Sequence, residues 1–141
     1  MFRIDNQSRQ AVYEQIVQQV EKYVLSGILV GGNKMPSVRK LSTTLNVNPN
    51  TVQRAYTELE RSGVIVTAPG RGAFVSDSGG TVLREERRKE YLKKLEEVLM
   101  ELKISNVDKK QILAIVDRAF EEKIPVDKEQ ASAFEGGNDD D

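Results

Sequence analysis

The chain of 141 residues contains no cysteine, no histidine and no tryptophan. Without cysteine there are neither disulfides nor thiolate chemistry, and without histidine the commonest general base and transition-metal ligand is missing. No apolar run approaches the roughly 20 residues that a membrane helix needs, and the N-terminus lacks the apolar core of a signal peptide. These absences argue against an enzyme, a bound metal or cofactor and a membrane protein, and they predict a cytoplasmic location.

Charge is almost balanced overall but unevenly distributed along the chain. The formal net charge is −1, with +4 on residues 1–76 and −5 on residues 77–141. Such asymmetry is typical of a module that faces nucleic acid, joined to an acidic body. The field near bound DNA would be positive although the whole protein is slightly acidic.

The stretch from Met35 to Tyr56 has the pattern of two helices joined by a short turn. Ser37 can cap the first helix, and Asn48 followed by Pro49 is a favoured start for the second. The turn at residues 46–48 is too short for the helices to run antiparallel, so they should cross steeply. This pattern predicts a helix-turn-helix.

Apolar and polar positions separate cleanly on these two helices. The apolar residues at helical spacing, which predict a shared core, are Val38, Leu41, Leu45, Val52, Ala55, Tyr56 and Leu59. The second helix then turns Asn50, Thr51, Gln53 and Arg54 outward. Asn and Gln pair with adenine, Arg pairs with guanine, and Thr contacts thymine or phosphate. Four arbitrary polar residues would usually be a solvated helix face, but the turn, the caps and the sequence that follows favour DNA recognition.

A supporting helix precedes this motif and a hairpin follows it. Residues 10–26 carry apolar side chains at steps of three and four, which predicts an amphipathic helix. Residues 64–67 and 73–75 read as two short strands around a Pro/Gly turn. A hairpin in this place is the wing of a winged helix, with Arg71 at its tip. A lone Arg in a turn is usually solvated, but here we expect it to approach the minor groove or a phosphate.

The remaining chain reads as a linker, two helices and a tail. Residues 77–80 are predicted to be a linker, residues 81–124 a two-helix region, and residues 125–141 a disordered acidic tail. Two amphipathic helices alone cannot bury their apolar faces, so we expect a second copy of the chain to cover them. The alternative is packing on their own winged helix. The predicted dimerisation residues are Leu92, Leu95, Leu99, Leu102, Ile112, Val116 and Phe120.

These motifs resemble the GntR family of bacterial transcription regulators, in its small YtrA-like branch. The stretches that carry the resemblance are residues 35–41, 45–60, 63–65 and 70–75, with residues 2–5 and 13–16. The resemblance implies a winged-helix repressor that binds an inverted-repeat operator as a homodimer. It also implies that Ser37 and Arg39 contact phosphate or bases. Larger members carry an effector domain, but the C-terminal part here is short and lacks histidine, so a small-molecule effector stays open.

The predicted fold is α+β, with a winged helix-turn-helix over residues 1–76 and a dimerisation region after it. Phosphate contacts fix the register on double-stranded DNA, and the start of the second helix reads bases. The predicted DNA-binding residues are Ser37, Arg39, Lys40, Asn48, Asn50, Thr51, Gln53, Arg54, Gly70, Arg71 and Gly72. The alternative function is a winged-helix module that binds protein, which would need no outward polar residues after a proline start.

Overall fold

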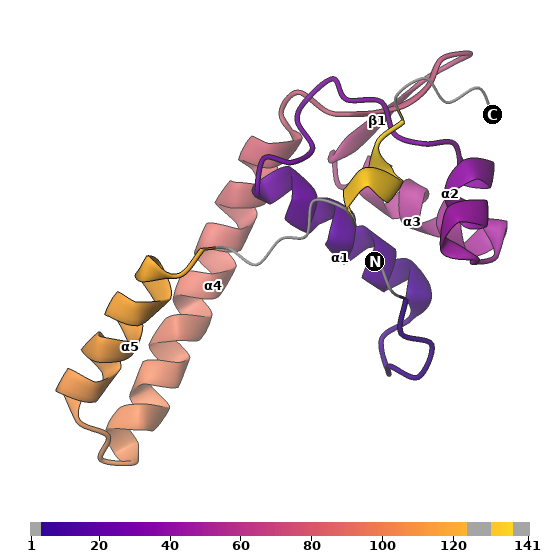
Figure 1. Cartoon of the computed structure of the whole chain (residues 1–141). Helices are drawn as coiled ribbons and strands as arrows, with labels where there is room; N and C mark the ends of the chain where they lie inside the picture. The colour runs from indigo at the N-terminus through magenta and orange to yellow at the C-terminus, as the bar shows by residue number, and fades with distance from the viewer. Residues whose placement is uncertain (1–3, 124–130, 137–141) are drawn as a thin grey trace. The chain divides into compact units, whose positions relative to one another are not determined.

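The computed structural model of the protein describes residues 4–123 and 131–136 (Figure 1). Its elements are α1 (Val12–Leu25), α2 (Val38–Leu45), α3 (Pro49–Arg61), β1 (Ile65–Ala68), β2 (Gly72–Val75), α4 (Gly79–Ile104), α5 (Lys109–Glu121) and a 3₁₀ turn, η1 (Ser132–Phe134). The described residues fall into two compact units, residues 4–84 with 131–136 and residues 85–123. The first unit contains a winged helix and the second a helical hairpin, which confirms the predicted α+β class.

The helix boundaries follow the capping signals in the sequence. The Ser37 side chain accepts a hydrogen bond from the Lys40 amide at 3.0 Å, and that of Asn48 accepts one from the Asn50 amide at 2.8 Å. Pro49 takes the first helical position of α3, where no donor is needed. Asn46, with φ of 55°, ends α2 in the left-handed region. The short turn between α2 and α3 is therefore fixed at both ends by side-chain and backbone geometry.

The core of the winged helix forms where α1, α2 and α3 pack together. The fully buried side chains on these helices are Ile16, Val20, Tyr23, Leu41, Val52, Ala55 and Leu59. They recur at the helical spacing seen in the sequence, so each helix buries one face and leaves the other to solvent. Consequently α3 packs against α1 and α2 on one face, and its other face is exposed to solvent.

The wing is a two-stranded antiparallel hairpin with a short third segment beside it. β1 pairs with β2 in a register that places Ile65 opposite Val75. On the other side of β2, the Met35 amide donates to the carbonyl of Ala73 at 2.8 Å, and Lys34 forms a bridge with Phe74. The chain entering α2 is thus tied to the wing by backbone hydrogen bonds.

The predicted linker over residues 77–80 is wrong in its second half. Gly79 begins α4, is buried, and lies so close to Val64, the residue before β1, that a Cβ there would be 2.9 Å from the Val64 carbonyl oxygen. Leu83, one turn later, is also buried in the winged-helix core. The glycine serves close packing rather than flexibility, so the first turn of α4 belongs to the winged helix.

The predicted disorder of residues 125–141 is wrong for residues 131–136. Ala131 and Phe134 are completely buried in the core of the winged helix. The physical reason is that burial of the apolar Phe134 ring is favourable, whereas Ser132 and Glu135 stay exposed and keep their hydration. Residues 124–130 and 137–141 lie outside the described part of the chain.

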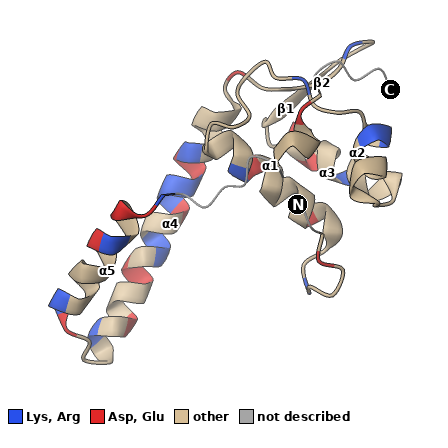
Figure 2. Cartoon of the chain, in the orientation of Figure 1, with Lys and Arg blue, Asp and Glu red and all other residues tan. Residues whose placement is uncertain are grey.

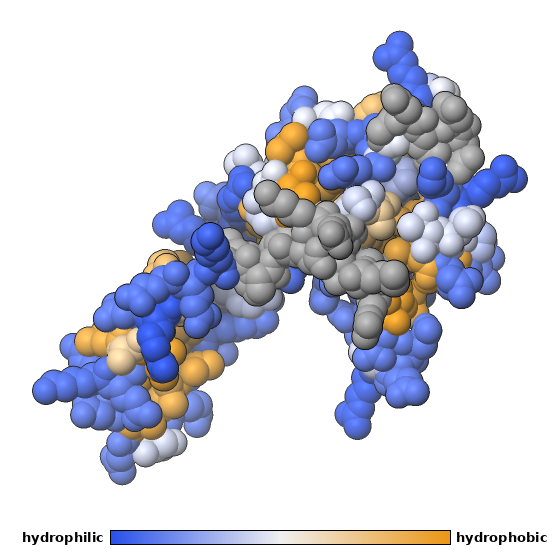
Figure 3. All heavy atoms as spheres, in the orientation of Figure 1, coloured by the Kyte–Doolittle hydropathy of each residue, from blue (hydrophilic) through white to orange (hydrophobic). Residues whose placement is uncertain are grey.

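The second unit is a hairpin of α4 and α5. Asp108 caps α5 by accepting a hydrogen bond from the Lys110 amide at 3.1 Å, and Asn106, with φ of 61°, shapes the turn. No residue of α5 is buried, and Phe120 is 88% exposed. Figure 3 shows hydrophobic atoms gathered on the surface of this hairpin. Within the described residues, no helix is long and apolar enough to cross a membrane.

Candidate nucleic-acid interface

The start of α3 presents polar side chains to solvent. Asn48, Asn50, Gln53 and Arg54 are exposed, and Thr51 is half-buried. Their amides and guanidinium lie at the N-terminal end of the helix, where unpaired backbone N–H groups and the helix dipole favour negative charge. This end of α3 can therefore contact both base edges and phosphates.

The start of α2 adds positive charge to the same end of the domain. Arg39 and Lys40 are exposed, while Ser37 is half-buried and caps the helix. The Tyr56 hydroxyl of α3 donates a buried hydrogen bond to the carbonyl of Pro36 at 2.6 Å. Because this bond joins α3 to the residue preceding the Ser37 cap, it fixes the beginning of α2 relative to the recognition helix.

The wing brings one further cation. Arg71 is exposed at the tip of the hairpin, between Gly70 with φ of 78° and Gly72 with φ of 106°. Both glycines adopt left-handed backbone that other residues rarely tolerate. They let the turn close tightly, with the Arg71 amide donating to the Ala68 carbonyl at 2.9 Å. Figure 2 shows Lys and Arg on α2 and at the end of this hairpin.

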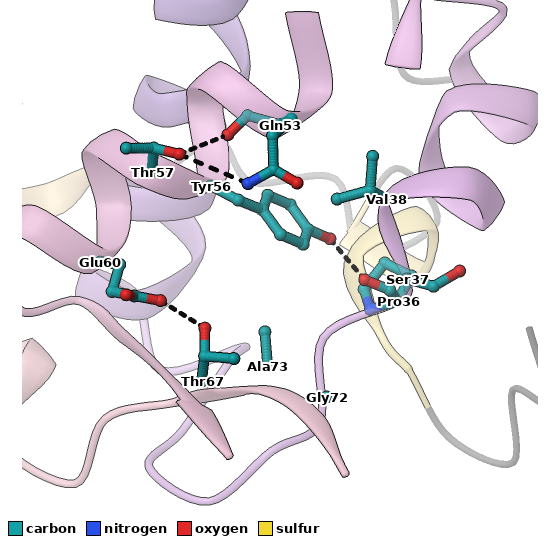
Figure 4. Close-up of a pocket in the computed structure, with 10 residues that line it drawn as sticks. All are labelled: Pro36, Ser37, Val38, Gln53, Tyr56, Thr57, Glu60, Thr67, Gly72 and Ala73. Atoms are coloured by element: carbon teal, nitrogen blue, oxygen red, sulfur yellow. Dashed lines mark hydrogen bonds between the residues drawn. The ribbon is translucent and has the colours of Figure 1, made fainter. Parts of the chain in front are cut away.

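A groove of 330 Å³ lies between α2, α3 and the wing (Figure 4). Ser37, Gln53 and Gly72, each predicted from sequence to bind DNA, line it from three different elements. Its remaining walls include two residues that sequence reasoning missed, Thr57 and Glu60. Thr57 donates to the Gln53 carbonyl at 3.0 Å, and Glu60 accepts a hydrogen bond from Thr67 of β1. The Glu60–Thr67 bond holds the wing against the recognition helix.

Arg54 lies on the side of α3 that faces α1. Its guanidinium carbon is 3.8 Å from the centre of the Tyr13 ring, a cation–π contact. Glu58 lies one turn further on and is paired with Arg61 at 2.8 Å. The hydrogen bond from Arg61 lowers the pKa of the Glu58 carboxyl, with a smaller contribution from the charge of Arg54. Sequence reasoning placed Tyr13 only on the amphipathic stripe of the first helix and did not foresee this contact.

Residues 12–75, which include all these elements, match the family model described as bacterial regulatory proteins, gntR family. The HTH-type transcriptional repressor YtrA of Bacillus subtilis is 48% identical to the chain over 98 residues, covering 67% of this chain and 75% of that protein. This chain belongs to the GntR family. It is a DNA-binding transcription regulator of the YtrA-like branch, as the sequence predicted, and not an enzyme.

Solved structures of GntR-type regulators share the fold. A transcriptional regulator from Oenococcus oeni superposes with a TM-score of 0.69 and 33% identity, over 82% of this chain and 96% of that one. YtrA from Sulfolobus acidocaldarius, a GntR-family transcription factor, superposes with a TM-score of 0.55 and 34% identity, over 66% of this chain and 95% of that one. Identity above 30% over most of each of these chains supports a shared fold with GntR-type regulators.

The GntR-family chain carries its predicted dimerisation residues in two groups. Leu99, Leu102 and Ile112 are half-buried within the hairpin, where a groove of 520 Å³ opens beside the α4–α5 turn. The more exposed group is Leu92, Leu95, Val116 and Phe120, each over 40% accessible. In the described part of the chain there is no group of three or more acidic, histidine or cysteine side chains placed to hold a metal ion.

Proposed function

We propose that this GntR-family protein is a cytoplasmic repressor that binds an inverted-repeat operator as a homodimer. The observation that carries the proposal is the N-terminal half of α3, which begins at a capped proline and leaves Asn50, Gln53 and Arg54 exposed. A helix of this kind fits the major groove of duplex DNA. Repression is supported by the name of the Bacillus subtilis relative.

The two ends of the interface have different roles in this proposal. Arg39, Lys40 and the amides at the start of α2 contact phosphates and set the register of the protein on DNA. Asn50, Thr51 and Gln53 contact bases, because they lie on the part of α3 that enters the groove first. Arg71 reaches from the wing toward the minor groove or the adjacent phosphate.

The exposed apolar surface of the hairpin supports a homodimer. Large apolar side chains cover much of α4 and α5, and single chains seldom leave such a surface open to water. A second copy offers the same surface, so a two-fold interface is self-complementary. Two recognition helices related by that symmetry would read half-sites separated by about 34 Å, one turn of the double helix.

The test is selection of bound fragments from a random pool of duplex DNA. The proposal expects a symmetric sequence motif with two half-sites about 10 base pairs apart. Absence of any enriched sequence at low salt would overturn specific DNA binding. Enrichment of a single, unrepeated half-site would retain DNA recognition but overturn the symmetric dimer.

Gln53→Ala is expected to remove discrimination at one base pair of each half-site. A bidentate amide contact to a base contributes about 1–3 kcal/mol, so binding to the preferred operator falls by that amount while binding to the variant base pair changes little. The measurement is a titration against all four bases at each operator position. An unchanged preference profile would show that Gln53 does not read a base.

Tyr13→Leu is expected to weaken binding to all operators about two- to fivefold, because the ring no longer positions the Arg54 guanidinium. Tyr13→Phe keeps the ring and is the matched control, with binding expected at the wild-type level. Fluorescence anisotropy over a range of salt concentrations measures both. Equal losses for the two variants would mean that the ring is not what positions Arg54.

A further inference from the structure

The most distant part of the described chain completes the core of the DNA-binding unit. Residues 131–136, named here the C-terminal latch, follow α5 in the sequence yet pack against α1 and α2. The Phe134 ring is fully buried, with its centre 5.5 Å from that of Tyr23 in α1 and the two planes tilted by 53°. Ala131 is fully buried as well. The latch is therefore an integral layer of the winged helix.

The end of the latch lies against the strand that leads into α2. The Gly136 amide donates to the carbonyl of Lys34 at 2.6 Å. A Cβ atom at Gly136 would lie 2.6 Å from the Lys34 oxygen and 2.7 Å from the Met35 oxygen, closer than real side chains approach backbone. Any other residue at position 136 would have to move the backbone away, so glycine is required for this close contact with residues 34–35.

Those two residues connect directly to the DNA-reading edge. The Met35 amide bonds the Ala73 carbonyl of β2, and Lys34 bridges to Phe74. The next residue is Pro36, whose carbonyl accepts the Tyr56 hydroxyl of α3. Ser37, which caps α2, follows. The latch thus contacts a stretch of backbone that is bonded to β2, leads into α2 and adjoins the Pro36 carbonyl bonded by α3.

We propose that the C-terminal latch controls DNA affinity by holding residues 34–35, and that its release from the winged helix weakens operator binding. This inference rests on the proposed DNA-binding function and assigns it a regulatory element. The latch is short, so its release would give up the burial of Ala131 and Phe134 and the Gly136 hydrogen bond. Detachment would expose the Phe134 ring and the side of Tyr23 that it contacts.

Latching would be coupled to DNA binding because the released state would bind DNA less tightly than the latched state. A ligand or partner that favours the released state would then lower DNA affinity.

The experiment compares Phe134→Asp with Glu135→Asp in the full-length chain. An unpaired carboxylate is strongly disfavoured in the fully buried site of Phe134, so the first variant releases the latch. Glu135 is exposed, and its replacement conserves charge. We expect Phe134→Asp to lose at least tenfold in affinity for the selected operator at low temperature, and Glu135→Asp to bind like the wild type. Sedimentation should report the wild-type oligomeric state for both.

Hydrogen exchange at residues 34–35, compared with amides of the α1–α3 core, separates local release from a general loss of stability. Release should speed exchange of the Met35 and Val75 amides, which bond to Ala73 and Asn33. By reciprocity, saturating operator DNA should slow exchange of the Gly136 amide in the wild type. Wild-type affinity in Phe134→Asp, or no effect of DNA on Gly136, would overturn the proposal.

Two further features keep the test decisive. If Phe134→Asp does not fold, Gly136→Ala replaces it, because the added Cβ displaces the end of the latch and leaves the Phe134 ring in the core. Wild-type affinity in Gly136→Ala would then overturn the proposal. Failure of the wild type to bind any DNA would instead refute the proposed function, while faster exchange at Met35 in the variants would still show that the latch holds residues 34–35.

Discussion

Leu95→Asp is expected to convert the proposed dimer into monomers and to lower operator affinity about 100-fold or more. Leu95 lies on the apolar face of α4 and is 48% exposed in the single chain, so a partner copy would bury much of it. A charge at a buried apolar contact is strongly unfavourable. Binding of two linked recognition helices exceeds that of one by a factor of about 10²–10⁴, and this factor is lost with the dimer.

Sedimentation equilibrium at micromolar concentration measures the first effect, and titration against full and half operators measures the second. The matched control is Ala114→Asp, an exposed position of α5 opposite its apolar face, which introduces the same charge. It should remain dimeric. Half-site binding should be the same for wild type and Leu95→Asp. A wild-type protein that sediments as a monomer would refute the dimer directly.

Phe134→Ala is expected to lower the free energy of unfolding by about 3–5 kcal/mol, the usual cost of deleting a fully buried phenylalanine side chain. The substitution removes the ring that contacts Tyr23 and leaves a cavity between α1 and the latch. Urea unfolding followed by circular dichroism gives the measurement. If the latch detaches instead of leaving a cavity, the denaturant dependence of unfolding also falls, since less surface is buried in the folded state.

The control for this prediction lies next to it in the sequence. Glu135 is exposed, and Glu135→Ala should change the free energy of unfolding by less than about 0.5 kcal/mol. An unfolding midpoint for Phe134→Ala equal to that of the wild type would mean that the ring contributes nothing to the core. The burial of residues 131–136 would then be without energetic consequence.

Much of the winged helix follows from local signals in the sequence. Ser37 and Asn48 cap their helices as their residue types predict, and the period of the apolar residues places Leu41, Val52 and Leu59 in the core. Caps and apolar periods depend on residues close together in the sequence, so they can be recognised without knowing the tertiary structure. The predicted DNA contacts on α2, α3 and the wing are exposed or half-buried, which is compatible with their proposed roles.

What sequence reasoning missed depends on contacts between distant residues. Phe134 lies in a polar stretch with no helical or strand period, so nothing nearby predicts that it packs on Tyr23. Gly79 has the residue type of a linker, and only the proximity of Val64 shows that it is needed for packing. The Tyr13–Arg54 contact joins two helices whose facing sides the sequence pattern leaves undetermined.

The burial of Phe134 has a consequence for protein synthesis. All residues of the helix-turn-helix leave the ribosome before residues 131–136 are translated, and at about 5–20 residues per second the nascent chain waits seconds for its final aromatic ring. During that interval the domain lacks the ring that packs on Tyr23. The core of the DNA-binding unit is therefore completed only after α4 and α5 have been made.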